Sequence, residues 1–187
     1  MNEHAVSETI KALGLPRVYQ LGIVVNNIEK ALPFYTEFMG ITPWYRGVVA
    51  DMKTIYHGAE IEADVDMIFG YSGRLMIEII EPKGGDANIY SEHLRTQGEG
   101  LHHLGIEVRN YEGCMKRIDE MGIPVIQSGA LKSKGGAMSK FAYIDTTAWC
   151  GYPIEIMETR LFGLPLGKGQ FMMRVGCLLG DAEKVRA

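Results

Sequence analysis

An internal repeat limits the fold of this chain more than any other feature. The segment QLGIVV at residues 20–25 returns as HLGIEV at residues 103–108, and IEIIE at 77–81 returns as IEIME at 154–158. Both ends of one unit recur in the same order, so we interpret the chain as carrying a duplicated module. Two such modules can cover each other and leave a cleft between them.

Each copy has the pattern of a βαβββ unit. The first predicts a strand, a helix and three strands, at residues 18–25, 28–39, 45–56, 65–69 and 75–80. The second predicts the same order, at residues 101–108, 111–121, near 125, 141–144 and 153–157. A further short helix is expected in the linker, over residues 89–96.

We therefore predict an α+β fold in which paired βαβββ modules form a curved mixed sheet around a metal-containing cleft. The cleft belongs to one domain over residues 17–159, with its modules at 17–82 and 101–159. Residues 1–16 are expected to form an N-terminal helical extension, with its helix at 7–13. Residues 160–187 form a C-terminal extension.

Composition and charge narrow the class of partner. The formal net charge is -4 with no long run of either sign, which disfavours a nucleic-acid groove or a basic membrane patch. No apolar stretch approaches the roughly 20 residues that span a bilayer, and residues 1–4 show no basic region leading into an apolar stretch, so we expect no secretory signal. Three cysteines give neither a CxxC pair nor an even set. We expect a cytoplasmic protein that acts on a small molecule.

Four polar side chains occupy matching positions in the two copies. Gln20 corresponds to His103 in the first strand, and Glu78 corresponds to Glu155 in the last. Strand alternation points each glutamate away from its apolar neighbours, either to bulk water or into the cleft. Two buried carboxylates would each cost several kcal/mol without compensation, so carboxylates in the cleft predict a bound cation.

These four side chains form a candidate metal shell. The alternatives are a solvated strand face for the glutamates and a hydrogen-bonded core residue for His103. An amide oxygen, an imidazole and two carboxylates suit zinc, cobalt, nickel, manganese or magnesium better than copper, and the pattern does not choose among these five ions.

The repeat motifs resemble those of a known superfamily. The segment at 20–25, the helix carrying Phe34-Tyr35 and ending at Gly40, the segment GEGLHHL at 98–104 and the terminal Ile154-Glu155 look like the vicinal oxygen chelate (glyoxalase/bleomycin resistance/dioxygenase) superfamily. Within it the chain is most similar to methylmalonyl-CoA epimerases, with glyoxalase I second. The resemblance covers about residues 17–159.

The resemblance implies roles for individual residues. His103 matches the metal-binding histidine of the His-His pair, and Glu155 matches a glutamate that is both ligand and base. Counting back from Glu78 in the epimerase pattern reaches Glu62 as the second acid–base, although a surface-loop role for Glu62 is an equal alternative. The epimerases often carry glutamine at the position of Glu78, whereas glyoxalase I carries glutamate.

Gln20 departs from the usual histidine of the epimerases. Some glyoxalases carry glutamine there, which gives the same Gln, Glu, His, Glu set as this chain. The departure counts against an extradiol dioxygenase, because its iron site needs two histidines and one carboxylate.

The implied function is a metal-dependent epimerase or isomerase that moves a proton α to a carbonyl through a metal-stabilised enolate. Methylmalonyl-CoA is the leading substrate, so an acyl-CoA is the expected partner, and a homodimer is the expected assembly. The first alternative is a lactoylglutathione lyase of the glyoxalase I type. The second is a small-molecule-binding resistance protein without catalysis.

Overall fold

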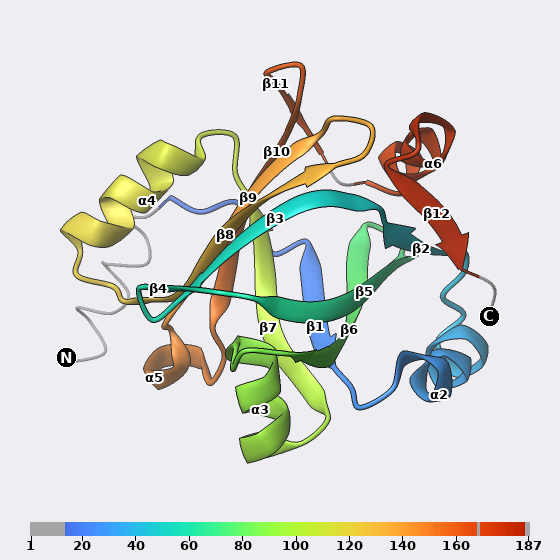
Figure 1. Cartoon of the computed structure of the whole chain (residues 1–187), viewed down its shortest axis with the longest axis horizontal. Helices are drawn as coiled ribbons and strands as arrows, with labels where there is room; N and C mark the ends of the chain where they lie inside the picture. Colours follow the sequence, from blue (N-terminus) through green and yellow to red (C-terminus); the bar gives the residue numbers. More distant parts are fainter. Residues whose placement is uncertain (1–13, 168, 186–187) are drawn as a thin grey trace.

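The two predicted modules are present and form one continuous curved sheet (Figure 1). The computed structural model describes residues 14–167 and 169–185, so the helix expected at 7–13 lies outside the described residues. No described helix is long and apolar enough to cross a membrane. The α+β prediction with paired modules is confirmed.

The first copy contains the predicted elements and two extra strands. Its elements are β1 (Gln20–Val24), α2 (Ile28–Pro33), the π-helix η1 (Phe34–Phe38), β2 (Trp44–Gly47), β3 (Val49–Tyr56), β4 (Ala59–Ile61), β5 (Ala63–Ser72) and β6 (Leu75–Gly85). The linker helix is α3 (Ile89–Gln97). The second copy contains β7 (Gly100–Glu107), α4 (Tyr111–Glu120), β8 (Val125–Ser133), β9 (Met138–Ile144), the short helix α5 (Thr147–Cys150) and β10 (Ile154–Leu161).

The sheet joins the two copies through their first strands. Its order is β12-β2-β5-β6-β1-β7-β10-β9-β8-β3-β4, with β11 paired to β10. β1 and β7 pair antiparallel at the centre, and each runs parallel to the last strand of its own copy, β6 or β10. This arrangement makes neighbours of the four strands that carry the candidate metal ligands, β6, β1, β7 and β10.

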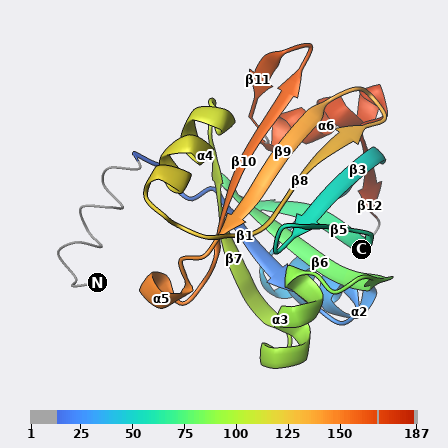
Figure 2. The same cartoon turned by 60° about the vertical axis from the view of Figure 1, so that its left-hand side comes forward.

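The segment predicted as one strand at residues 45–56 is two strands with different partners, which corrects the sequence reading. β2 pairs with β5 near one end of the sheet, whereas β3 pairs with β8 of the other copy. Only Val48 separates the two strands. The insertion that contains β3 and β4 therefore carries the chain across the open side of the curved sheet, from the first copy to the second (Figure 2).

Helices α2 and α4 cover the outer face of the sheet, one in each copy (Figure 2). Asn27 and Asn110 cap them, because each side chain accepts a backbone N–H of the first turn. Ile28 and Leu32 anchor α2 in one apolar cluster, and Ile118 of α4 lies in the equivalent cluster of the second copy. The outer apolar face is thereby buried, and the inner face stays available for a site.

The C-terminal extension contacts both copies, through β10 of the second and β2 of the first. It contains β11 (Leu164–Leu166), α6 (Gln170–Leu179) and β12 (Ala182–Val185). β12 adds to the edge of β2 in antiparallel register, from Ala182 opposite Gly47 to Val185 opposite Trp44. This pairing fixes α6 over one end of the curved sheet (Figure 1).

Candidate metal site and cavity

The central strand pair holds one candidate ligand from each copy against a glycine of the other. Gln20 packs over Gly105, and His103 packs over Gly22. A Cβ at Gly22 would lie 1.8 Å from the His103 Cε1 atom, and a Cβ at Gly105 would lie 2.7 Å from the Gln20 Cβ atom. The glycine two residues after each ligand therefore makes room for the ligand of the opposite copy.

The two glutamates of the last strands meet His103 between the copies. The Nε2 atom of His103 lies 3.4 Å from an oxygen of Glu78 and 3.5 Å from an oxygen of Glu155. Ligand atoms of all three residues lie within 4.8 Å of one another, and all three side chains are buried. Glu78 and Glu155 thus converge inside the protein rather than facing bulk water.

Gln20 joins the same cluster through its amide. Its Nε2 atom donates a hydrogen bond of 2.6 Å to the Oε2 atom of Glu78. Its Oε1 atom is buried and makes no hydrogen bond to the described residues. The structure therefore brings together all four side chains that the repeat predicts as ligands.

A β-bulge places His102 beside His103 instead of on the opposite face. In the β1–β7 register Gly22 pairs with His103, and Ile23 pairs with Leu101, so His102 is the extra residue. The Nδ1 atoms of the two histidines lie 2.9 Å apart in hydrogen-bond contact. Because this contact uses Nδ1 of His103, its Nε2 atom stays directed at the two carboxylates.

Electrostatics distinguish the two adjacent histidines. Burial, with the neighbouring His103 and His93, lowers the pKa of His102 to about 2, so His102 is neutral. Burial also lowers the pKa of His103, but the carboxylates of Glu155 and Glu78 outweigh it and raise that pKa to about 9. A neutral His102 accepts the Nδ1 proton of His103 and is also hydrogen-bonded to the backbone of Ile89.

Two tyrosines orient Glu155. The Tyr143 hydroxyl donates a hydrogen bond of 2.8 Å to the Oε1 atom of Glu155, and the Tyr90 hydroxyl lies 2.7 Å from that of Tyr143. Burial raises the pKa of both tyrosines well above its usual value, and the charges of Glu78 and Glu155 raise it further. Both hydroxyls therefore stay protonated, and Oε2 of Glu155 is the oxygen nearer His103.

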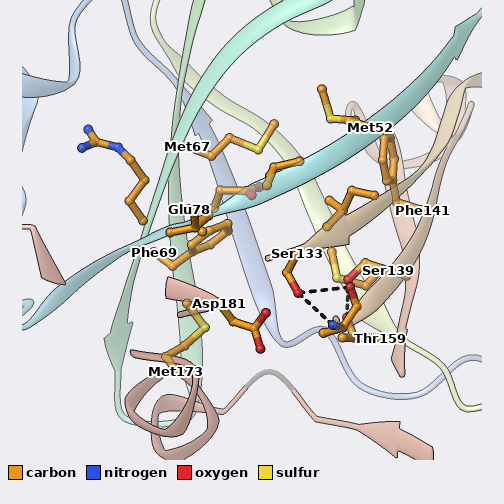
Figure 3. Close-up of a pocket in the computed structure, with 18 of the residues that line it drawn as sticks. Met52, Met67, Phe69, Glu78, Ser133, Ser139, Phe141, Thr159, Met173 and Asp181 are labelled. Atoms are coloured by element: carbon orange, nitrogen blue, oxygen red, sulfur yellow. Dashed lines mark hydrogen bonds between the residues drawn. The ribbon is translucent and has the colours of Figure 1, made fainter. Parts of the chain in front are cut away.

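A cavity of about 440 Å³ opens from this cluster. Its walls include Glu78, Glu155, Tyr90 and Tyr143, together with many apolar side chains. Figure 3 shows Glu78 at one side of the cavity, Phe141 on the second copy, and Met173 of α6 at the lower end. The volume falls in the range of small-molecule sites.

Glu62 lies outside this cavity. It is exposed at the junction of β4 and β5, where its backbone N–H donates to the Asp86 carboxylate at 3.0 Å. Together with Asp86 it lines a separate surface groove. The structure does not bring Glu62 to the cluster of Gln20, Glu78, His103 and Glu155.

The cluster fits a divalent metal ion. His103 Nε2 and Gln20 Oε1 are buried without a hydrogen bond to the described residues, and two carboxylates lie beside them. Ligand atoms about 2.1 Å from one ion lie roughly 3 Å apart at a right angle, close to the separations between His103 and the glutamates. Two buried carboxylates lie next to a nitrogen and an oxygen that have no hydrogen bond and can coordinate a metal, and a cation would complete this environment.

Several residues of the site were not found by sequence reasoning. Tyr143 lies directly opposite Glu155 in the β9–β10 register, so correct strand pairing was the signal that could have found it. The bulge that brings His102 to His103 leaves no mark in the sequence. Met173 and the rest of α6 lie in an extension with no repeat partner.

The fold and the cluster define the class of this protein. Paired βαβββ modules, a curved sheet and a central carboxylate–imidazole cluster make up the vicinal oxygen chelate fold with a candidate divalent-metal site. The sequence profile of the Glyoxalase/Bleomycin resistance protein/Dioxygenase superfamily matches residues 19–143. The chain belongs to this superfamily.

Relatives narrow the comparison. The chain is 26% identical over 144 residues to the mitochondrial methylmalonyl-CoA epimerase of Bos taurus, covering 77% of this chain and 74% of the bovine protein. It is 28% identical over 101 residues to the human mitochondrial enzyme, covering 54% of this chain and 51% of that protein. A Streptomyces coelicolor methylmalonyl-CoA epimerase variant in complex with 2-nitronate-propionyl-CoA shares the fold, with a TM-score of 0.54, 17% identity, and coverage of 76% of this chain and 96% of that chain. These relatives support an epimerase-like enzyme.

Proposed function

We propose that this protein is a divalent-metal-dependent epimerase or isomerase that moves a proton α to a carbonyl group. The observation that carries the proposal is the convergence of Glu78, His103 and Glu155 inside a small-molecule cavity, with unsatisfied atoms of His103 and Gln20 beside them. A metal-free binding protein would not need four convergent ligand side chains at this point.

The chemistry of the site follows from its donor set. Glu78, His103 and Glu155 would hold the ion, and Gln20 would join them after a rotation that exchanges its amide nitrogen and oxygen. When bound, the ion supplies Lewis-acid stabilisation of the negative charge that develops on a substrate carbonyl oxygen. The surrounding apolar walls keep water away and strengthen that interaction.

Glu155 is the proposed base. Tyr143 holds its Oε1 atom, its Oε2 atom lies 3.5 Å from Nε2 of His103, and the side chain lines the cavity in which a substrate would bind. In the metal-free arrangement Glu78 accepts from the Gln20 amide instead, and its proposed role is that of a ligand only. The two equivalent glutamates therefore have different tasks because their hydrogen-bond partners differ.

Epimerisation also needs a group that delivers a proton to the opposite face of the substrate, and Glu62 stays a prediction for this role. Its exposed position requires the β4–β5 junction to approach the substrate. Glu62→Gln tests the assignment: continued α-proton exchange with loss of stereochemical inversion supports it, and unchanged inversion contradicts it.

Methylmalonyl-CoA is the first substrate to assay, because the named relatives are methylmalonyl-CoA epimerases. An acyl-CoA partner, a homodimer and a cytoplasmic location are part of the same proposal. The Gln20, Glu78, His103, Glu155 set also favours a second candidate, a lyase of the glyoxalase I type. An assay with methylglyoxal and a thiol measures that activity directly.

The test combines metal analysis with proton exchange. Purified protein is dialysed against each of the five candidate ions, its metal content is measured, and racemic methylmalonyl-CoA is incubated with it in heavy water. We expect about one ion per chain and deuterium incorporation at the α carbon, with neither in His103→Ala. Exposed His57→Ala is the matched control. If the metal-loaded protein exchanges no α proton of methylmalonyl-CoA, the assignment as an epimerase of this substrate is wrong.

A further inference from the structure

The C-terminal extension supplies one wall of the cavity. Met172, Met173, Val175 and Leu179 of α6 are among its lining residues. Figure 3 shows Met173 extending from α6 toward Phe69, which lies beside Glu78. α6 follows both modules and lies beyond the residues that match the superfamily profile. The wall is therefore an addition to the two-module fold.

Backbone contacts fix this wall to both copies. The backbone N–H of Val48, between β2 and β3, donates to the carbonyl oxygen of Asp181 at 2.8 Å. The backbone N–H of Gly135, in the β8–β9 turn, donates to the Asp181 carboxylate at 2.7 Å. Because Asp181 directly follows α6 and its capping residue Gly180, these two bonds hold the helix in place over the cavity.

Away from the carboxylate–imidazole cluster, the charges around the cavity disfavour an anionic group. Among the described residues that line it, Arg46 is the only cationic side chain, and both of its donor contacts, at 2.7 and 2.9 Å, are made to Asp66. The acidic lining residues outnumber this one cation. Phosphate groups would find no free positive partner there, whereas uncharged carbon chains would contact methionine, leucine and phenylalanine side chains.

We propose that α6 is the specificity wall of this site, and that the group it recognises is an uncharged apolar body attached to the reacting carbonyl end of the substrate. This inference rests on the proposed function, because the carbonyl end is placed at the carboxylate–imidazole cluster. The cavity volume accommodates a chain well beyond the methyl branch of methylmalonyl-CoA. The methionines of α6 adapt to such a chain because their side chains are unbranched and flexible.

A chain-length series of 2-oxo acids tests the proposal. Pyruvate, 2-oxohexanoate, 2-oxooctanoate and 2-oxodecanoate carry the same vicinal oxygens and differ only in the apolar chain. Their dissociation constants are measured by calorimetry with zinc-loaded and with metal-free protein. We expect affinity to increase up to about fourfold per buried methylene in both forms. Equal affinity along the series overturns the inference.

The same measurement separates this inference from the proposed function. The slope with chain length reports the apolar wall, whereas a constant difference between zinc-loaded and metal-free protein reports the carboxylate–imidazole cluster. A slope without that difference keeps the wall and removes the metal role. The difference without a slope keeps the metal role and removes the wall.

Substitutions on α6 locate the wall. Met173→Gln keeps the side-chain length. It is expected to make the increase in affinity from pyruvate to 2-oxodecanoate roughly tenfold smaller. Phe171→Gln is the matched control, because Phe171 lies on the same helix with 73% of its surface exposed. Met172→Gln gives a second measurement should Met173→Gln fail to fold. An unchanged slope in the folded α6 variants overturns the assignment.

The apolar body can belong to a free carbonyl compound or to a thioester whose CoA stays outside the cavity. Titration of free CoA into protein saturated with 2-oxodecanoate distinguishes these two sources. Binding of CoA alongside the bound 2-oxodecanoate assigns the thioester, and no CoA binding assigns the free compound.

Discussion

The two copies place equivalent ligands on equivalent strands but support them differently. In the second copy, His102 holds His103 and Tyr143 holds Glu155. In the first copy, Gln20 and Glu78 hold each other through one hydrogen bond, and the residue equivalent to His102 is Tyr19, whose hydroxyl donates to the sulfur of Met157 at 3.0 Å. The second copy is therefore the preorganised half of the site, and the first copy is the adaptable half.

This difference indicates how a duplicated module acquires asymmetric chemistry. The ligand positions come from strand pairing, which both copies share. The roles come from the residues that contact those ligands, and these have diverged.

The largest difference is expected between the two glutamates. Glu155→Gln removes the proposed base and should lower α-proton exchange roughly 1000-fold. Glu78→Gln replaces a carboxylate ligand with a neutral amide ligand, the type common at this position in the epimerases, and should lower α-proton exchange roughly tenfold. Exchange is measured at saturating metal, with metal content determined for each variant. Equal losses in the two variants would contradict a separate base.

The next largest difference is expected between Gly22 and Gly105, the glycines that pack against His103 and Gln20. Gly22→Ala places a methyl group on the His103 ring and should lower the free energy of unfolding by ~3 kcal/mol. Gly105→Ala meets Gln20 at longer distances and should cost about 1 kcal/mol. Urea unfolding of the metal-free proteins measures both. The opposite order would show that Gln20, not His103, is the rigid partner.

The residues that precede the two first ligands provide a third comparison. His102→Phe removes the hydrogen bond to Nδ1 of His103 and should weaken zinc binding about 10- to 100-fold. Tyr19→Phe removes only the contact with Met157 and should leave zinc affinity unchanged. Competition with a chromophoric chelator measures both, with thermal unfolding as the fold control. Equal affinities would show that His102 has only a packing role.

The smallest effect is the pH dependence of zinc affinity, which comes from the proton on His103 of the second copy. The pKa of His103 is raised to about 9 in the metal-free protein, so zinc must displace its proton, and zinc affinity should rise up to about tenfold per pH unit between pH 7 and 9. Since the folded-state pKa lies above the unfolded value, this group stabilises the metal-free protein fully below pH 6.5 and loses that effect as pH rises through 9.

Calorimetry of zinc binding in buffers of different ionisation enthalpy should detect one proton released per ion at pH 7.5. The metal-free protein should become less stable between pH 6.5 and 9, and His103→Gln should abolish both effects. Zinc binding without proton release would show that His103 is neutral in the folded protein.

The sequence predicted much of this site because the repeat carries it. Gln20, His103, Glu78 and Glu155 could be matched without coordinates, and strand alternation left only two directions for the glutamates. The order of strands and helices in each copy and the linker helix were predictable for the same reason, since periodicity and glycine positions recur along the chain.

The remaining features depend on long-range pairing, which periodicity does not encode. The segment at 45–56 divides at Val48 because its two halves pair with strands of different copies. Counting back from Glu78 across this insertion led to Glu62, which lies outside the cavity. The bulge at His102 and the position of α6 likewise follow from neighbours far away in the chain.

The single-residue link at Val48 has a consequence for how a ligand reaches the cluster. Because β2 and β3 are covalently continuous and β3 pairs with β8, the strands form a closed loop of fixed circumference rather than two jaws on a hinge. The halves cannot part without breaking the β3–β8 ladder. Entry must therefore run along the axis of the loop, and the ends of the loop, rather than its width, determine which molecules pass.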